Sequence, residues 1–522
     1  QNADACLLEL LKGISLINYS KALQIISETS GIIVMCCKAN DACSRLTALC
    51  WLHEFVRLET TEGSHVVNRK PNDSWVAILP DILSGTLHCI DDPEGEIAHM
   101  AVETNNSLLE MVQNLRADIP VDKLVDQLLQ SMQLKDRMIV RTACLQWICM
   151  LLEQSPAQMK RRSTWHRLCT PIFDTLLHSD DEVVVAALRV LAQIMEGRNV
   201  DEDDVQDGDG DLFTEVVHQL LKLFESDSCL LETRGRLMIR QLCGHLSPRR
   251  LYVTVAHAIQ RESETDARFA QQLVQTFSWI LLTSAETKSL REELLATAPV
   301  SDLHSTPQTD SGAAETWGPA AADVPPLFLE LLEPWFQNPV SALALCLWAQ
   351  QYELASELTA RLAAFEPTLD LLKQLDQLVH LLESPVFSRL RLRLLEPRRH
   401  PALLKCLLGL AMLLPQAGAF SILRERISVV QSGLLLDAQG VDSLPREAAG
   451  SGANGPDASA TGHMLWWSGG GSNSGARAAG SPSGASRYDT DLASLLKRFD
   501  SLTAAGHGNA ALGALGCDQH RD

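Results

Sequence analysis

The chain has 522 residues, and its formal charge is −21, from 44 Lys and Arg against 65 Asp and Glu. Such a length exceeds one ordinary globular core, so we expect several domains or a repeat array. The acidic balance argues against nucleic-acid binding and against direct adhesion to anionic lipid, because both need clustered basic residues. Aromatic residues make up only 5% while Leu and Ala dominate, which favours helices over sheets.

The 14 cysteines are scattered, mostly within apolar runs, and form no framework of spaced pairs, which favours a reducing compartment. No signal peptide opens the chain. The longest apolar candidate, Ala402 to Leu414, is too short to span a membrane and carries Lys405. Because Gln1 rather than Met begins what reads as the middle of a helix, we expect a fragment or an incomplete gene product.

Residues 1–200 are predicted to form HEAT-like repeats. Each copy has an acidic residue before an apolar helix with a small residue in its second turn, and these small residues are Ala48, Ala101, Ala143 and Ala187. Their spacings of 53, 42 and 44 residues lie close to the roughly 40–47 residues of HEAT and armadillo units. We expect Asp41, Asp136 and Asp180 to cap these helices, and the alanines to allow close helix packing.

The helices between the copies complete the repeats. Trp75 to Ile90, Val121 to Met132 and Trp165 to His178 are predicted to be the first helices of successive pairs. No single pair can bury its apolar face alone, so the pairs are expected to stack into an all-α solenoid. The alternative is an irregular helical domain.

Residues 201–211, DEDDVQDGDGD, are predicted to form a solvated acidic loop. A calcium loop starting at Asp207 would need a glycine where Leu212 stands and a glutamate where His218 stands. Further helical repeats are expected over residues 212–300, where Cys243 and Arg249 have the C-x5-R spacing of a phosphatase loop. Pro248 removes one backbone N–H from that loop, so a packed core cysteine is the favoured interpretation.

A Ser/Thr/Ala/Pro/Gly-rich linker is expected at residues 301–323, and a C-terminal helical block at 324–432. Asn338 reads as an N-cap and Pro339 as the first helical residue. The block's helices are predicted at Val340–Gln351, Tyr352–Phe365, Thr368–Leu382, Pro385–Leu395, Pro401–Leu414 and Ala417–Val430. We expect disorder at 433–486, a terminal amphipathic helix at 487–503 that is a plausible docking element, and disorder at 504–522.

No P-loop, nucleophile elbow or zinc-ligand spacing occurs, so no catalytic, cofactor or metal site is predicted. His53 and His88 lie beside apolar helix faces, where packing is the favoured role. Repeat solenoids usually bind other proteins, which favours a binding function over catalysis.

The C-terminal block resembles one known family. The runs WFQNPVSALALCLWAQQYELASEL, LVHLLESPVFSRLRLRLL and PALLKCLLGLAMLLPQAGAFSILRERI look like the C-terminal region of the vacuole-morphology HEAT scaffolds, also called the ArPIKfyve family. Upstream, RLTALCWLHEFVRL, LLETRGRLMIRQLC and SWILLTSAETKSLREEL look like the preceding repeats of that family, and YDTDLASLLKRFDSL resembles its terminal helix. The family commonly has His where this chain has Gln337.

The resemblance implies a non-catalytic scaffold of the complex that makes and turns over phosphatidylinositol 3,5-bisphosphate. It implies three partners: a Sac-domain phosphoinositide 5-phosphatase, the FYVE-domain lipid kinase PIKfyve, and further copies of the chain in a star-like pentamer. Kinase contacts would depend in part on N-terminal repeats that this chain lacks. The expected place is the cytoplasmic face of endosomal and vacuolar membranes, with indirect membrane contact.

Candidate partner-binding residues come from two blocks. In the C-terminal block they are Trp335, Asn338, Pro339, Gln350 and Tyr352, where Trp335 is alternatively a hydrophobic staple and Tyr352 is expected to pack while exposing its hydroxyl. In the repeats they are Arg234, Arg240 and Gln241.

For the two arginines, bonds to carbonyls or carboxylates inside the solenoid are the favoured interpretation. Gly235 between them predicts close helix approach or a break. The alternative functions are a generic α-solenoid adaptor for another protein and an enzyme using Cys243 and Arg249.

Overall fold

The computed structural model describes a chain that divides into two compact units, Gln1–Arg291 and Glu292–Asp522. The described residues are 19–63, 73–114, 119–133, 137–196, 212–261, 267–296, 327–441 and 493–502, with four isolated positions before residue 19. Every regular element in these ranges is a helix, which confirms the predicted all-α class. None of these helices is long and apolar enough to cross a membrane. The predicted acidic loop and linker lie outside the described residues, as do 442–486 of the predicted tail and 504–522.

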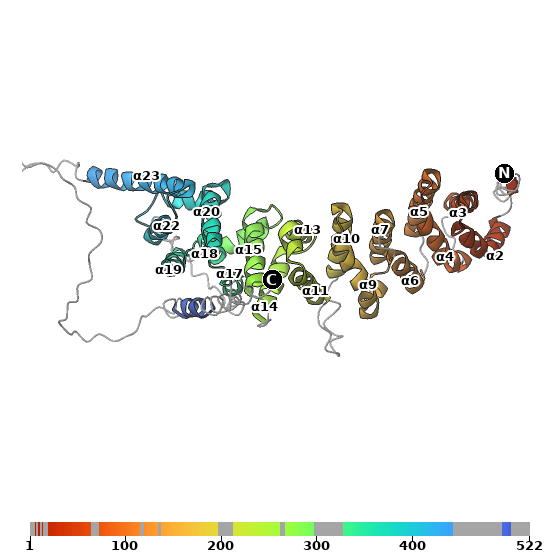
Figure 1. Ribbon diagram of the computed structural model, residues 1–522, viewed down its shortest axis with the longest axis horizontal. Helices are drawn as coiled ribbons and strands as arrows, with labels where there is room; N and C mark the ends of the chain where they lie inside the picture. Colours follow the sequence, from red (N-terminus) through yellow and green to blue (C-terminus); the bar gives the residue numbers. More distant parts are fainter. Residues whose placement is uncertain are drawn as a thin grey trace, which may run out of the picture. The chain divides into compact units, whose positions relative to one another are not determined.

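Unit 1 stacks its helices in two layers, as the predicted repeats require (Figure 1). One layer contains α2 (Tyr19–Cys37), α4 (Asp73–Cys89), α6 (Val121–Met132), α9 (Arg162–Leu176), α11 (Leu212–Ser226) and α14 (Pro248–Arg261). The other contains α3 (Ala42–Gly63), α5 (Gly95–Asn114), α7 (Met138–Gln154), α10 (Asp181–Met195), α13 (Arg236–His245) and α15 (Ala267–Thr283). Short elements fill the remainder: α8 (Pro156–Met159), α12 (Ser228–Leu230), the π-turn η2 (Leu231–Gly235) and α16 (Lys288–Ala296).

The four repeat alanines are buried in the second layer, with at most 6% of their surface exposed. Small side chains at these positions let α3, α5, α7 and α10 pack directly on one another. Two of the three predicted caps are confirmed: the Asp41 carboxylate accepts from the Ser44 N–H at 2.9 Å, and Asp180 accepts from the Glu182 N–H at 2.9 Å. The third prediction is wrong, because Arg137 is the N-cap residue of α7 and gives no side-chain cap.

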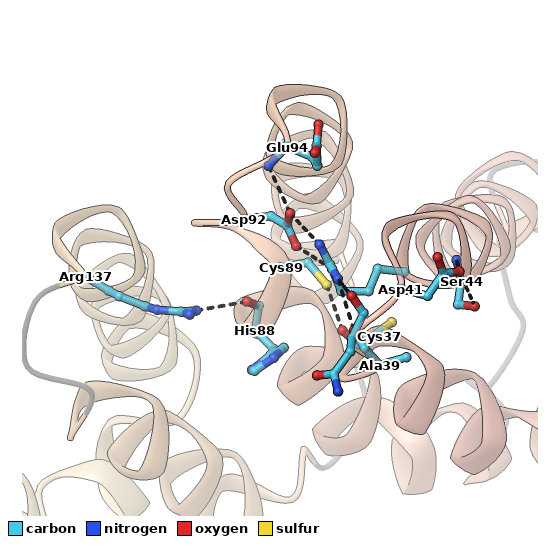
Figure 2. Close-up of polar contacts among 11 residues, drawn as sticks. Cys37, Ala39, Asp41, Ser44, His88, Cys89, Asp92, Glu94 and Arg137 are labelled. Carbon is cyan, nitrogen blue, oxygen red and sulfur yellow. Dashed lines mark hydrogen bonds and ion pairs between the residues drawn. The ribbon is translucent and has the colours of Figure 1, made fainter.

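Arginines link successive repeats of unit 1 through the ends of their helices. Arg45 donates to both carboxylate oxygens of Asp92, at 2.7 and 3.0 Å, and also to the carbonyls of Ala39 and Asn40. Figure 2 shows Asp92 between this contact and the Glu94 N–H, with Arg137 reaching the His88 carbonyl on the other side. The last carbonyls of a helix have no partner within it, so these bonds fix the angle between neighbouring repeats.

Neither histidine singled out in the sequence has catalytic surroundings. His88 is half-buried, and loss of solvation lowers the pKa of its imidazole. The His53 ring contacts the Thr104 hydroxyl at 3.3 Å. Both side chains pack between repeats, as predicted.

Unit 2 contains α17 (Leu327–Trp335), α18 (Pro339–Trp348), α19 (Tyr352–Leu362), α20 (Leu369–Glu383), η4 (Pro385–Phe387), α21 (Ser388–Arg393), α22 (Pro401–Leu413) and α23 (Gly418–Val441). Prolines stand at the first positions of α18, η4 and α22, as their missing N–H allows. The helix predicted from Pro385 is instead a 3-10 turn followed by the six-residue α21. The last long helix, α23, continues through residues 433–441, which the sequence assigned to the tail.

Two contacts hold the core of unit 2 together. Helices α19 and α22 meet at Gly409, where an added Cβ would lie 2.8 Å from the methyl carbon of Thr359. Helices α20 and α23 are joined by Arg426, which donates two hydrogen bonds to Glu383 at 3.1 and 2.6 Å. The close approach at Gly409 explains why glycine occurs in the middle of an otherwise Leu-rich helix.

Candidate partner-binding site

The turn between α17 and α18 buries most of the predicted partner residues. Asn338 is 0% exposed and caps α18 by accepting from the Ser341 N–H at 3.0 Å, with Pro339 next to it. Trp335 is also 0% exposed and ends α17, so it is the last residue of one helix rather than a staple for the next. Burial favours the structural interpretation of Trp335 and Asn338, and only Pro339 and Gln337 reach the surface in part.

Gln350 occupies an unusual backbone position between α18 and α19. It is the one residue other than glycine with a positive φ in the described part of the chain, at 60°. The Gln351 N–H donates to the Cys346 carbonyl at 2.9 Å, across five residues, so α18 ends in a Schellman motif with Gln350 at the position that glycine usually takes. A glutamine held there is strained relative to glycine, which points to a role for its side chain.

The side chain of Gln350 meets residues from a distant part of unit 2. Its Oε1 accepts from Arg393 at 3.3 Å, and the same guanidinium lies 3.2 Å from Nε2 of His400. The Tyr352 ring packs edge-on against the His400 ring at 5.7 Å. The expectation that Tyr352 exposes its hydroxyl is wrong, because that oxygen is buried. This cluster ties α19 to the turn before α22, and no local sequence signal identified Arg393 or His400.

The arginine block of unit 1 surrounds the π-turn η2. Arg234 donates to the carbonyls of His178 and Ser179 and pairs with Asp181 at 3.0 Å. Arg240 pairs with Glu286 at 2.9 Å, and this hydrogen bond is the main cause that lowers the pKa of the Glu286 carboxyl. These bonds are of the kind that the sequence favoured for the two arginines, while Gln241 is half-buried.

Gly235 permits the π-turn. A Cβ at this position would lie 2.8 Å from the Leu231 side chain one turn earlier, within the widened helix. Both predicted features, close approach and a local break in α-helical geometry, therefore occur at the same residue.

Cys243 does not have the properties of a nucleophile. It is 3% exposed in α13, and burial raises the pKa of its thiol to about 12. A phosphatase cysteine needs a lowered pKa and a cradle of backbone N–H groups. Arg249 instead belongs to the first turn of α14, beyond a helix break at residues 246–247. The Cys243–Arg249 pair therefore reads as part of the helical core.

An exposed face on α21 was missed in the sequence. Leu392 and Leu395 are 64% and 71% exposed, and Arg389 and Arg398 are exposed on either side of them in sequence. Arg389, Leu392 and Leu395 follow at intervals of three residues, so they lie along one side of a helical turn. We call Arg389, Leu392, Leu395 and Arg398 the α21 face. Its mixture of apolar and cationic side chains is typical of the centre and rim of a protein interface.

Comparison with known proteins identifies relatives of this region. A family model for the C-terminal region of vacuolar protein 14, described by the binding of one protein partner there, matches residues 228–430. The match includes the arginine block, the buried turn at Trp335, the Gln350 cluster and the α21 face.

Full-length relatives are similar over most of this chain. "Protein VAC14 homolog" of Arabidopsis thaliana is 32% identical over 438 residues, which is 82% of this chain and 51% of the relative. "Vacuole morphology and inheritance protein 14" of Saccharomyces cerevisiae is 28% identical over 77% of this chain and 40% of the relative. "Protein VAC14 homolog" of Schizosaccharomyces pombe is 29% identical over 79% and 45%. The chain thus spans about half the length of the curated relatives it matches.

Proposed function

We propose a function for this chain from the premise that these comparisons supply: it belongs to the Vac14 family. The chain acts as a non-catalytic scaffold in the complex that makes and turns over phosphatidylinositol 3,5-bisphosphate. Its direct partner is a Sac-domain phosphoinositide 5-phosphatase. The observation that carries this proposal is the match of residues 228–430 to a family model named for binding one protein partner, which we take to be that phosphatase.

The remaining partners follow from the same family. The chain associates with further copies of itself and joins the phosphatase to the PIKfyve-type kinase, with kinase contacts depending in part on the N-terminal repeats of the family. It works at the cytoplasmic face of endosomal and vacuolar membranes through its partners. The stacked helices of unit 1 support this role, because such arrays present extended surfaces to other proteins.

We place the phosphatase contact on the α21 face. The face lies inside the matched region and exposes two leucines to solvent that a protein partner would cover. Arginines beside exposed leucines suit a partner surface with an apolar patch bordered by carboxylates. The matched region is named for a protein partner, so a protein ligand is favoured over lipid or nucleic acid.

Capture of the phosphatase by the purified chain tests both statements. We expect the wild-type chain to retain a Sac-domain phosphatase, and the paired changes Leu392→Ser and Leu395→Ser to reduce retention at least ten-fold. Reversal of charge at Arg389 and Arg398 to Glu should weaken retention further at low salt. Ile32→Ser is the control, because Ile32 is 65% exposed in unit 1 and lies outside the matched region.

The outcomes separate the function from the surface. A wild-type chain that captures no phosphatase would contradict the proposed function. Full capture by the leucine and arginine variants, with capture by wild type, would leave the function standing and remove the α21 face as the contact. Each variant's helix content by circular dichroism shows that a loss of capture is not a loss of folding.

A further inference from the structure

A short helix far along the chain is seated on unit 2. Residues 493–502 form this helix, and Leu496 and Phe499 are its buried side chains, at 7% and 0% exposure. The sequence predicted the helix and proposed that it docks, and the structure gives the surface that receives it.

The receiving surface lies at the end of α17 and just beyond the end of α19. The Phe499 ring meets the Phe336 ring edge-on at 5.3 Å and stacks on the Phe365 ring at 6.2 Å. We call the surface formed by Phe336, Phe365, Glu333 and Arg361 the aromatic groove. Phe336 is 0% exposed with the helix in place.

Charged residues on both sides of Phe499 meet charges of opposite sign on the groove. Asp500 accepts a hydrogen bond from Nε of Arg361 at 2.9 Å. Arg498 pairs with Glu333. The groove therefore recognises a basic residue, a phenylalanine and an acidic residue in that order, with Leu496 on the same side of the helix. Two opposite charge pairs also fix the direction in which a helix lies, which apolar burial alone does not do.

Chain connectivity does not force the helix onto this groove. Residues 442–492 separate it from α23, and a stretch of that length can reach at most about 170 Å. The helix therefore takes this position because of its contacts with Phe336, Phe365, Glu333 and Arg361. A short segment held by side-chain contacts at the end of a long connection is a ligand that the protein carries itself.

We propose that the aromatic groove is a sequence-specific binding site for a short amphipathic helix with the pattern Leu-x-Arg-Phe-Asp, and that the chain's own residues 493–502 occupy it in cis. The site is separate from the α21 face and does not depend on the phosphatase. Emptying the groove makes it available to the same helix added as a free peptide.

The test uses a fluorescent peptide spanning residues 488–503 and measures its anisotropy with the full chain. The wild-type chain should bind it weakly, because its own helix occupies the groove at a high effective concentration. The Phe499→Asp chain should bind it at least ten-fold more tightly. Lys497→Ala is the matched control, because Lys497 is exposed on the same helix, and this chain should behave as wild type. A peptide carrying Phe499→Asp should bind none of these chains.

A charge exchange tests the direction of binding. Arg361→Asp in the Phe499→Asp chain should abolish binding of the natural peptide, and a peptide with Asp500→Arg should recover most of it. Recovery would support recognition through this pair, since a general loss of structure would not be restored by a change in the peptide.

Three results would overturn the proposal. The first is a folded Phe499→Asp chain that binds the peptide no better than wild type. The second is equal binding of the natural and Phe499→Asp peptides. The third is a wild-type oligomer that dissociates on Phe499→Asp, which would show that a second copy supplies the helix. If Phe499→Asp does not fold, hydrogen exchange replaces it: excess free peptide should speed exchange of residues 493–502 in the wild-type chain, and unchanged exchange would contradict the proposal.

Discussion

Replacement of Gly409 by alanine tests the packing of unit 2 at its closest helix contact. The new Cβ would lie 2.8 Å from the methyl carbon of Thr359, which is shorter than van der Waals contact. Thr359 cannot rotate away freely, because its hydroxyl donates to the Ala355 carbonyl at 2.8 Å and contacts the Cys406 sulfur at 3.3 Å. We expect overpacking of about 1–3 kcal/mol, offset by about 1 kcal/mol of helix propensity gained over glycine.

The partner change Thr359→Ser isolates this contact. Serine keeps the hydroxyl and removes the methyl group, so alone it should lower stability by about 1 kcal/mol. In the double variant the alanine methyl fills the space that the threonine methyl left. The double variant should therefore be about as stable as Thr359→Ser alone, with a coupling free energy of about 1 kcal/mol or more.

Hydrogen exchange of α19 and α22, read by mass spectrometry, is the suitable assay, since two units need not unfold together. Gly418→Ala is the control, because nothing lies within 4 Å of a Cβ at Gly418. Strict additivity of the Gly409→Ala and Thr359→Ser effects would refute the assigned contact.

Three further predictions concern single residues. Asn338→Ala should lower the thermal stability of unit 2 by about 1 kcal/mol by removing the cap on Ser341, while Asn338→Asp should retain it; equal losses would contradict the capping role. Gln350→Val should destabilise by about 1–2 kcal/mol in urea titration, because a β-branched residue is disfavoured at φ 60°, whereas Gln350→Asn should be milder. Iodoacetamide should alkylate Cys243 far more slowly than the exposed Cys229 at pH 8, since burial raises the pKa of Cys243 to about 12. The unfolded thiol ionises near pH 9 and the folded thiol near 12, so the stability that this cysteine contributes is complete below pH 9 and lost between these values; no such loss would contradict its burial.

The features that sequence predicted correctly are those set by neighbouring residues. The repeat alanines, the Asp41 and Asp180 caps and the Asn338–Pro339 helix start all depend on spacings of a few residues, which local backbone geometry fixes. The Asp136 prediction was wrong because an acidic residue before a helix shows that a cap is near, but not which residue occupies the N-cap position.

The features that sequence missed depend on tertiary contacts. Arg393 and His400 are more than forty residues from Gln350, and nothing in the local pattern brings them to the end of α18. The same holds for Phe336 and Phe365, which meet Phe499 from more than 130 residues away. The exposed leucines of α21 read as core residues in the sequence because Leu at helical spacing usually faces a core, and only packing shows that this short helix leaves two of them uncovered.

The central claim is that this chain is a scaffold that associates with itself and with a Sac-domain phosphatase. Light scattering after size-exclusion chromatography measures it most directly, on the pure chain alone and on the chain mixed with the purified phosphatase. The account predicts a mass of several chains for the pure protein and a higher mass, with both proteins in one peak, for the mixture. A pure chain with the mass of one copy, and a mixture that elutes as two separate proteins, would contradict it.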